Sequence, residues 1–145
     1  YFISYYNFIY SKMKKFYTII TVAIFSFLAV ASLEDDAPSI DSSTEPDFTV
    51  SAPSLYTDYS DNEISADDKY KGKILQVSGT IRDIGNDIMD DAYVSLAGDG
   101  YYGNVQCYFS DKSVVANLKK GQQITVVGYC DGLMVNVLMK NCILK

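Results

Sequence analysis

The strongest constraint on the fold is a series of short alternating segments, separated by glycine-containing turns, over residues 73–144. In the first of these segments Leu75, Val77, Gly79 and Ile81 point to one side, and the intervening residues point to the other. A period of two residues predicts a half-buried β-strand. Similar segments follow at residues 93–96, 104–109, 124–130 and 133–144. The sequence therefore predicts a mainly β protein with five strands.

The order of these strands predicts a particular barrel. A short helix is expected between the third and fourth strands, with Ser110 as its N-cap and Gly121 at its end. Asp131-Gly132 has the composition of a tight hairpin turn between the last two strands. Three strands, a helix and a hairpin are the order of the five-stranded Greek-key OB fold, and Gly79 would permit the sharp bend of its first strand. An SH3-like small barrel is the alternative, and the position of the helix favours the OB fold.

A helix is predicted over residues 54–70, immediately before the barrel. Five apolar residues recur at nearly helical spacing and are expected to form a stripe that packs on the barrel: Leu55, Tyr59, Ile64, Ala66 and Tyr70. No glycine or proline interrupts the pattern before Gly72. Ser54 is the expected N-cap. The helix and the barrel together define one domain over residues 54–145.

The N-terminal part has the features of an export signal over residues 13–31. Two lysines follow Met13, an apolar core spans residues 16–30, and small residues precede Ser32. This pattern predicts a cleaved secretory signal peptide and an exported protein, in the periplasm or cell envelope or secreted. An uncleaved membrane anchor is the alternative, and a lipoprotein would need cysteine at position 32. Residues 1–12 resemble translated upstream sequence.

The segment over residues 32–53 is acidic, contains no lysine or arginine, and is rich in serine and proline. Such a composition predicts a disordered tether. The whole chain has 12 basic and 18 acidic residues, a net charge of −6. An acidic tether beside the domain repels phosphate within a Debye length of roughly 10 Å.

Several motifs resemble those of a known family. Residues 66–73 read Ala-Asp-Asp-Lys-Tyr-Lys-Gly-Lys, and residues 128–132 read Gly-Tyr-Cys-Asp-Gly. This combination resembles the exported bacterial OB-fold proteins called tRNA-anticodon-binding-like, over roughly residues 54–145. The resemblance implies an OB fold, and the family name implies nucleic-acid binding by analogy with anticodon-binding domains.

The candidate ligand-binding face is the outer surface of the second and third barrel strands, where OB proteins bind their ligands. The residues expected there are Tyr93, Tyr101, Tyr102, Gln106 and Tyr108, with Arg82 at the border. Tyrosines can stack on bases, sugars or peptides, but strand tyrosines can also be half-covered structural residues. The loops expected beside this face contain Asp83, Asp87, Asp90, Asp91 and Asp131. These carboxylates disfavour phosphate, and a calcium site among them is less expected than a solvated turn.

The chain contains three cysteines, an odd number for an exported protein. Cys107 and Cys142 are each expected late in strands that lie side by side, so a disulfide between them is favoured. Cys130–Cys142 is the rival pairing, and three buried thiols are the remaining alternative.

Enzyme chemistry has little support in this sequence. The chain contains no histidine, no phosphate-binding loop and no nucleophile elbow. We expect no cofactor and no metal. The sequence favours a non-catalytic binding module for an envelope protein, peptide, glycan or small ligand. The alternatives are an OB domain for single-stranded nucleic acid or tRNA, and a structural accessory domain of an envelope assembly.

Overall fold

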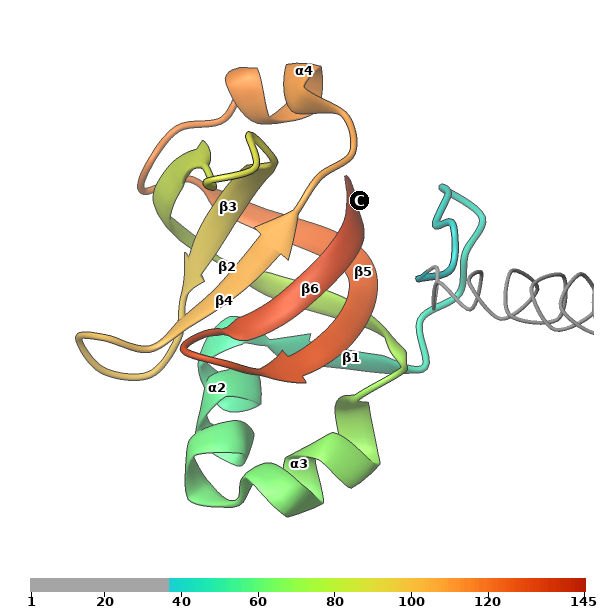
Figure 1. The fold of residues 1–145 in the computed structure, drawn as a ribbon, viewed down its shortest axis with the longest axis vertical. Helices are drawn as coiled ribbons and strands as arrows, with labels where there is room; N and C mark the ends of the chain where they lie inside the picture. The colour runs from blue at the N-terminus through green and yellow to red at the C-terminus, as the bar shows by residue number, and fades with distance from the viewer. Residues whose placement is uncertain (1–36) are drawn as a thin grey trace, which may run out of the picture. The chain divides into compact units, whose positions relative to one another are not determined.

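The computed structural model describes residues 37–145, in which a β-barrel packs against two helices (Figure 1). The expected signal peptide over residues 13–31, the segment 1–12 and the first part of the tether lie outside the described residues. No helix within residues 37–145 has the length and apolar character that crossing a membrane requires.

Five strands close the barrel. They are β2 (Ile74–Asn86), β3 (Ala92–Ala97), β4 (Asn104–Tyr108), β5 (Gln123–Leu133) and β6 (Val137–Leu144). The first half of β2 pairs with β5 and the second half pairs with β3, so this long strand joins both halves of the barrel. β4 pairs with β3 and lies parallel to β6, and β6 pairs with β5. The predicted mainly β, five-stranded OB fold is confirmed.

Gly79 lies just before the point where β2 changes partner, between Thr80 and Ile81. A Cβ atom at Gly79 would be 2.9 Å from the Cβ atom of Ala52 and 3.2 Å from that of Leu96. The glycine therefore allows the helix α2 (Ala52–Asp61), which precedes β2 in the chain, to approach the barrel wall closely. This close approach adds a second reason for glycine to the strand bend that the sequence suggested.

A sixth strand, β1 (Phe48–Ser51), lies in the segment that was expected to be a disordered tether. It pairs in parallel with β2, from Phe48 opposite Leu75 to Ser51 opposite Ser78. The register of β3 on β2 begins only at Ile81, so β1 occupies an edge of β2 that would otherwise be unpaired. This long-range pairing explains why a short, polar segment is ordered.

Two helices replace the single helix predicted over residues 54–70. They are α2 (Ala52–Asp61) and α3 (Glu63–Tyr70), and they meet at Asn62, whose φ of −159° is not helical. The Asn62 side chain accepts a hydrogen bond from the Ser65 amide and caps α3. The N-cap of α2 is Ser51 rather than Ser54. Four members of the expected apolar stripe are buried: Leu55, Tyr59, Ala66 and Tyr70. The prediction is wrong for Ile64, which is 79% exposed because the break at Asn62 turns α3 away from the direction of α2.

The last hairpin turns later than its composition suggested. Asp131 and Gly132 lie within β5, where the pairing with β6 is irregular and Gly132 has a φ of +94°. The chain reverses at residues 134–136 instead. Gly132 therefore serves a bulge inside a strand, a role for which glycine is as suitable as for a tight turn.

The short helix between the third and fourth barrel strands is α4 (Lys112–Ala116). Its N-cap is Asp111, whose carboxylate accepts from the Ser113 amide at 2.9 Å, rather than the expected Ser110. In β6, Asn141 has a φ of +51°. Its side-chain amide donates to the carbonyl oxygens of Ala37 and Pro38 at 2.9 and 3.0 Å. The start of the described segment is therefore attached to the last strand.

Candidate ligand-binding groove

An open groove of about 400 Å³ lies over β4 and β6. We call it the β4–β6 groove. It lies between the β2–β3 loop, residues 87–91, and the β5–β6 loop, residues 134–136. OB proteins generally bind their ligands over the second and third barrel strands, here β3 and β4, between the loops that correspond to the β2–β3 and β5–β6 loops. The groove shares β4 and these two loops with that surface, but it extends toward β6 rather than over β3. The groove is lined by Asp87, Asp91, Tyr108, Phe109, Ser110, Asp131, Met134, Leu138, Lys140 and Asn141.

Three of the predicted face residues lie together beside or within this groove. Tyr93 and Tyr108 are directly opposite each other on β3 and β4, with ring centroids 6.1 Å apart. The Gln106 side chain donates to the Tyr108 hydroxyl at 2.8 Å and accepts from the Asn136 side chain at 2.9 Å. Gln106 therefore connects the tyrosine pair to the β5–β6 loop and holds the Tyr108 ring in position.

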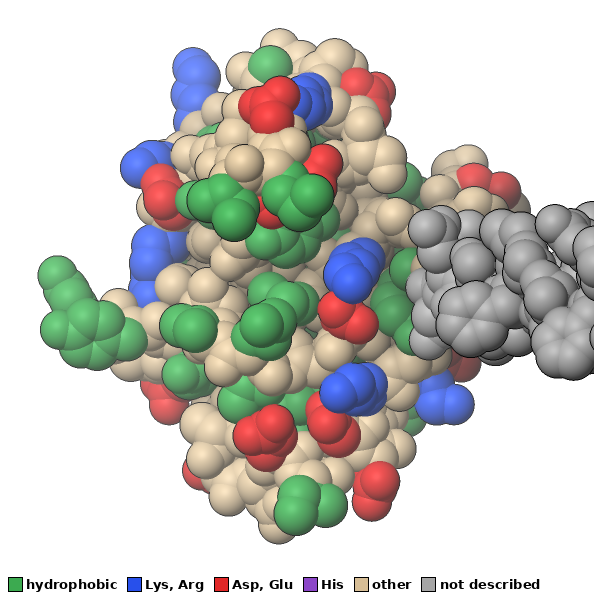
Figure 2. Space-filling model, in the orientation of Figure 1, with side chains coloured by type: hydrophobic (Ala, Val, Ile, Leu, Met, Phe, Trp, Pro, Cys, Tyr) green, Lys and Arg blue, Asp and Glu red, His purple; other side chains and the backbone are tan. Residues whose placement is uncertain are grey.

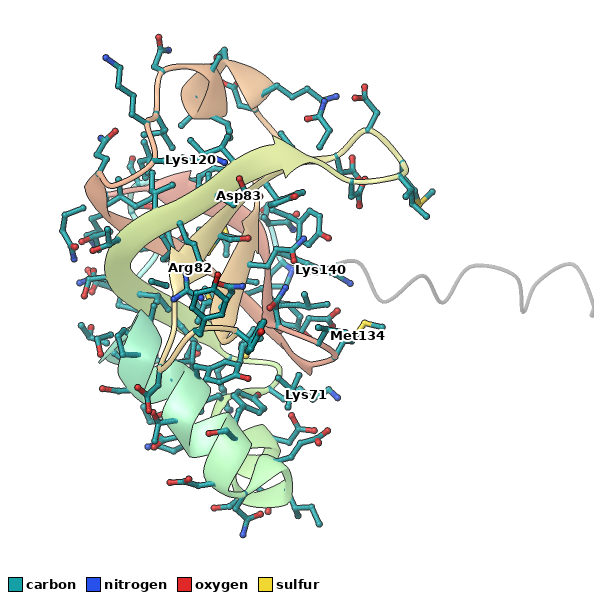
Figure 3. The ribbon with its side chains drawn as sticks, turned by 90° about the vertical axis from the view of Figure 1, so that its left-hand side faces the viewer. Lys71, Arg82, Asp83, Lys120, Met134 and Lys140 are labelled. Carbon is teal, nitrogen blue, oxygen red and sulfur yellow. The ribbon has the colours of Figure 1, made fainter. Side chains whose placement is uncertain are left out.

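The groove has a negative electrostatic character. Partial burial, followed by the nearby charges of Asp87 and Asp91, raises the pKa of Tyr108, with a further contribution from Tyr93. Among the described residues that line the groove, Lys140 is the one cation, and it forms an ion pair of 2.7 Å with Asp131. Figure 3 shows Lys140 and Met134 on the same side of the barrel. The unbalanced charges are therefore the carboxylates of Asp87 and Asp91.

The β2–β3 loop is folded around Asp87. One oxygen of this carboxylate accepts hydrogen bonds from the amides of Met89 and Asp91 at 2.8 and 3.0 Å. Asp90 accepts from the Asn86 side chain and pairs with Lys112 at 2.6 Å. The described residues contain no cluster of three or more acidic or cysteine side chains that could hold a metal ion. Asp87 instead binds amides of its own loop, and Asp90 binds the neighbouring Lys112.

Each loop beside the groove exposes two apolar side chains. Ile88 and Met89 project from the β2–β3 loop, with 104% and 79% of their surfaces exposed. Met134 and Val135 project from the β5–β6 loop, with 80% and 85% exposed. Hydrophobic and acidic side chains are neighbours on this face in Figure 2. Sequence reasoning did not identify these four residues, although two adjacent apolar residues inside a polar turn were a visible signal.

Arg82, Tyr101 and Tyr102 do not belong to the groove. The Arg82 guanidinium donates to the carbonyl oxygens of Gly100, Tyr101 and Gly103 and to the Asn104 side chain, at 2.9 to 3.1 Å. These hydrogen bonds hold the β3–β4 loop against β2. Tyr101 and Tyr102 project from this loop with 84% of their surfaces exposed. They lie at the opposite end of the β3–β4 hairpin from Tyr93 and Tyr108.

The three cysteines are free and buried, so the favoured disulfide is not formed. Cys107 and Cys142 are nevertheless neighbours: burial raises the pKa of the Cys142 thiol, and its hydrogen bond with Cys107 raises it further. Each thiol also faces a carbonyl of its own strand, that of Val105 or Lys140. These contacts allow both thiols to pack without a covalent bond. Cys130 instead contacts the Tyr59 hydroxyl at 3.5 Å.

A second depression lies between α4 and the end of β2 and is lined by Lys112, Lys119 and Lys120. Two of these lysines are paired, Lys112 with Asp90 and Lys120 with Asp83. Figure 3 shows Lys120 beside Asp83 near the end of β2. The ion pair with Lys120 lowers the pKa of Asp83. Lysines therefore gather at the α4 end of the barrel rather than along the β4–β6 groove.

Comparison with known proteins supports the fold and identifies the family. No curated protein matches the chain. A crystal structure from Klebsiella pneumoniae subsp. pneumoniae MGH 78578, described as a "putative nucleic acid-binding lipoprotein", is 21% identical with a TM-score of 0.56. The match covers 67% of this chain and 90% of that chain, and it shows a shared fold. The family model described as tRNA_anti-like matches residues 12–143. The chain therefore belongs to the tRNA_anti-like family.

Proposed function

We propose that this protein is an exported, non-catalytic binding module whose ligand lies in the β4–β6 groove. The observation that carries the proposal is the arrangement of Tyr108 between two projecting loops. A flat aromatic group, held by Gln106, lies on the surface where OB domains bind, and the loops on either side can enclose a ligand. Membership in the tRNA_anti-like family supports a binding role in general.

The charge of the groove favours a protein, peptide, glycan or small ligand over a nucleic acid. Nucleic-acid affinity depends largely on lysine and arginine side chains that neutralise phosphates. The groove instead presents Asp87 and Asp91, and its lysine is already paired with Asp131. A phosphate backbone would meet carboxylates along this surface without a free cation to compensate.

Two further observations support the remaining parts of the proposal. A chain without histidine lacks the commonest general base, which supports a non-catalytic role. In the β2–β3 loop, the Asp87 carboxylate is engaged by the backbone amides of Met89 and Asp91. Export is supported by the signal-like sequence over residues 13–31 and by the description of the structural relative as a lipoprotein.

Capture of ligands from an envelope extract tests the groove. Immobilised wild-type protein is compared with Tyr108→Ala and with the double variant Tyr101→Ala/Tyr102→Ala. We expect a ligand that is retained by wild type and by the double variant but lost by Tyr108→Ala. The double variant is a matched control because it removes two exposed tyrosines outside the groove. Equal capture by wild type and Tyr108→Ala would show that the groove is not the site.

An OB domain for single-stranded nucleic acid or tRNA is the second candidate. The description of the structural relative and the lysines beside α4 favour it. Fluorescence anisotropy with labelled single-stranded DNA and RNA, at two salt concentrations, separates the candidates. Micromolar or tighter binding that weakens with salt would overturn our preference. Lys119→Gln, which alters a lysine of the α4 depression, would then locate the contact.

A further inference from the structure

The apolar loop tips beside the groove are the starting point for this inference. Ile88 and Met89 on one side and Met134 and Val135 on the other are exposed. Exposed apolar groups that are gathered at one surface commonly mark an interaction site. They flank a groove whose unbalanced charges are carboxylates, so apolar and acidic features occur together on a single face of the barrel.

We propose that the β4–β6 groove binds a basic peptide segment of a protein partner, with apolar side chains of that segment on the two loop tips. This inference rests on the proposed function and specifies its ligand class. Lysine or arginine side chains of the segment would lie over the groove beside Asp87 and Asp91. Its apolar side chains would contact Met89 on one loop and Met134 on the other.

Charge complementarity selects this partner chemistry. The raised pKa of Tyr108 reflects a negative field from Asp87 and Asp91 at the floor of the groove, in addition to burial. Lys140 does not offset this field because it is paired with Asp131. A cation placed over Tyr108 would be attracted by both carboxylates and could also interact with the face of the aromatic ring.

The same charges argue against a membrane surface as the target of the apolar tips. Anionic headgroups attract basic segments, whereas Ile88 and Met89 are flanked by Asp87, Asp90 and Asp91. Strand addition is also disfavoured at this place, because β4 already pairs with β3 and β6. Recognition would therefore depend on side chains on both sides of the interface.

A set of matched synthetic peptides tests the proposal against the full chain by isothermal titration calorimetry. The first peptide alternates lysine and leucine, the second alternates glutamate and leucine, and the third alternates lysine and serine. We expect the lysine–leucine peptide to bind, the glutamate–leucine peptide not to bind, and the lysine–serine peptide to bind more weakly. Equal binding of the lysine and glutamate peptides would overturn the inference.

Variants of the acidic residues test the location of the basic groups. Asp87→Asn and Asp91→Asn should each weaken the lysine–leucine peptide by roughly two- to fivefold, as expected for exposed charge pairs. Asparagine at position 87 keeps an oxygen that can accept the loop amides. Asp68→Asn on α3 is the matched control because Asp68 is exposed and does not line the groove. An equal effect of all three variants would indicate only a long-range charge effect and would refute the inference.

Variants of the apolar tips test the second half of the proposal. Met89→Ser/Met134→Ser should lower the affinity for the lysine–leucine peptide and leave that for the lysine–serine peptide unchanged. Ile64→Ser is the control, since Ile64 is 79% exposed on α3 and outside the groove. If the tip variants bind like wild type, the tips do not contribute.

The outcomes separate this inference from the proposed function. Loss of the envelope ligand in Tyr108→Ala, together with no binding of the lysine–leucine peptide, would retain the groove as a site and reject a basic peptide as its ligand. Retention of the envelope ligand by Tyr108→Ala would reject the proposed function itself.

Discussion

Arg82→Met isolates the contribution of the guanidinium group to the β3–β4 loop, because methionine keeps an unbranched stem. The hydrogen bonds to the Gly103 carbonyl and the Asn104 side chain are partly buried, whereas those to Gly100 and Tyr101 are exposed. A hydrogen bond to a charged group contributes about 1.5–3 kcal/mol, and water replaces the exposed ones at little cost. Counting only the two partly buried bonds at the lower value, we expect the free energy of unfolding to fall by about 3 kcal/mol.

Equilibrium urea unfolding, followed by circular dichroism and tyrosine fluorescence, measures this change. The chain contains 13 tyrosines and no tryptophan, so tyrosine is its fluorescent probe. With a denaturant slope of about 1–3 kcal/mol per molar urea, a loss of about 3 kcal/mol moves the midpoint down by about 1–3 M. An unchanged slope would show that the variant differs in stability and not in the extent of unfolding.

Two matched variants make the result interpretable. Arg82→Lys keeps the positive charge but lacks the planar fork that reaches several acceptors, so we expect roughly half of the loss. Lys120→Met removes a solvent-exposed ion pair with Asp83, and it should change stability by less than about 1 kcal/mol. If Arg82→Met unfolds at the wild-type midpoint, water satisfies the loop carbonyls equally well, and the structural role assigned to Arg82 is wrong.

Three further predictions concern packing, thiols and acid. Gly79→Ala places a Cβ atom 2.9 Å from that of Ala52, so overpacking should lower the free energy of unfolding by about 1–3 kcal/mol. Urea unfolding measures this change, and an unfolding midpoint equal to that of wild type would contradict the close approach of α2. Alkylation in denaturant without reductant should label all three cysteines by mass spectrometry, and a single label would reveal a disulfide. The hydrogen bonds from the Tyr70 hydroxyl and from Lys69 lower the pKa of Asp58 in the folded protein. The Asp58 carboxylate therefore stabilises the fold at pH values above its unfolded pKa of about 3.9. This stabilisation is lost as the pH falls through the lower pKa of the folded state. Because the Asp58 carboxylate is exposed, Asp58→Asn should lower the free energy of unfolding by less than about 1 kcal/mol near neutral pH. The difference in stability between the variant and wild type should vanish near pH 2. A difference that persists at pH 2 would contradict this role of the Asp58 charge.

The barrel could be predicted because each of its strands has a buried face and an outer face. Leu75, Val77 and Ile81 are buried on one face of β2, and this asymmetry produces the period of two in the sequence. The pairing of β1 could not be found in this way, because it depends on an unpaired edge of β2 that lies far away in the sequence. The local sequence pattern indicates which residues of a strand are buried. It does not indicate that a distant strand, here β2, has an unpaired edge with which β1 can pair.

Turn chemistry explains the other differences. Gly132 has a positive φ, as a tight turn would require, but a bulge inside β5 requires the same conformation. Asn62 interrupts the helical segment and caps α3, in a stretch that contains neither glycine nor proline. In both cases the residue type is compatible with two local structures, and packing of the neighbouring elements decides between them.

The candidate site was predictable where it depends on strand periodicity. Tyr93, Gln106 and Tyr108 face outward together because strand alternation places them there. Arg82 also alternates outward, but its long side chain reaches the β3–β4 loop and is occupied by its carbonyl groups. The apolar tips of the two loops escaped notice because a loop has no period from which the direction of a side chain can be inferred.

The contact of Asn141 with Ala37 and Pro38 has a consequence for the architecture of longer chains. Asn141 belongs to β6, so Ala37 and Pro38, which precede the first strand, are held beside the last strand of the barrel. Domains with adjacent entry and exit points tolerate insertion into a host loop and circular permutation. A short linker between residues 145 and 37 should therefore permit circular permutation of the described domain. The same domain should also tolerate insertion into a surface loop of a host protein.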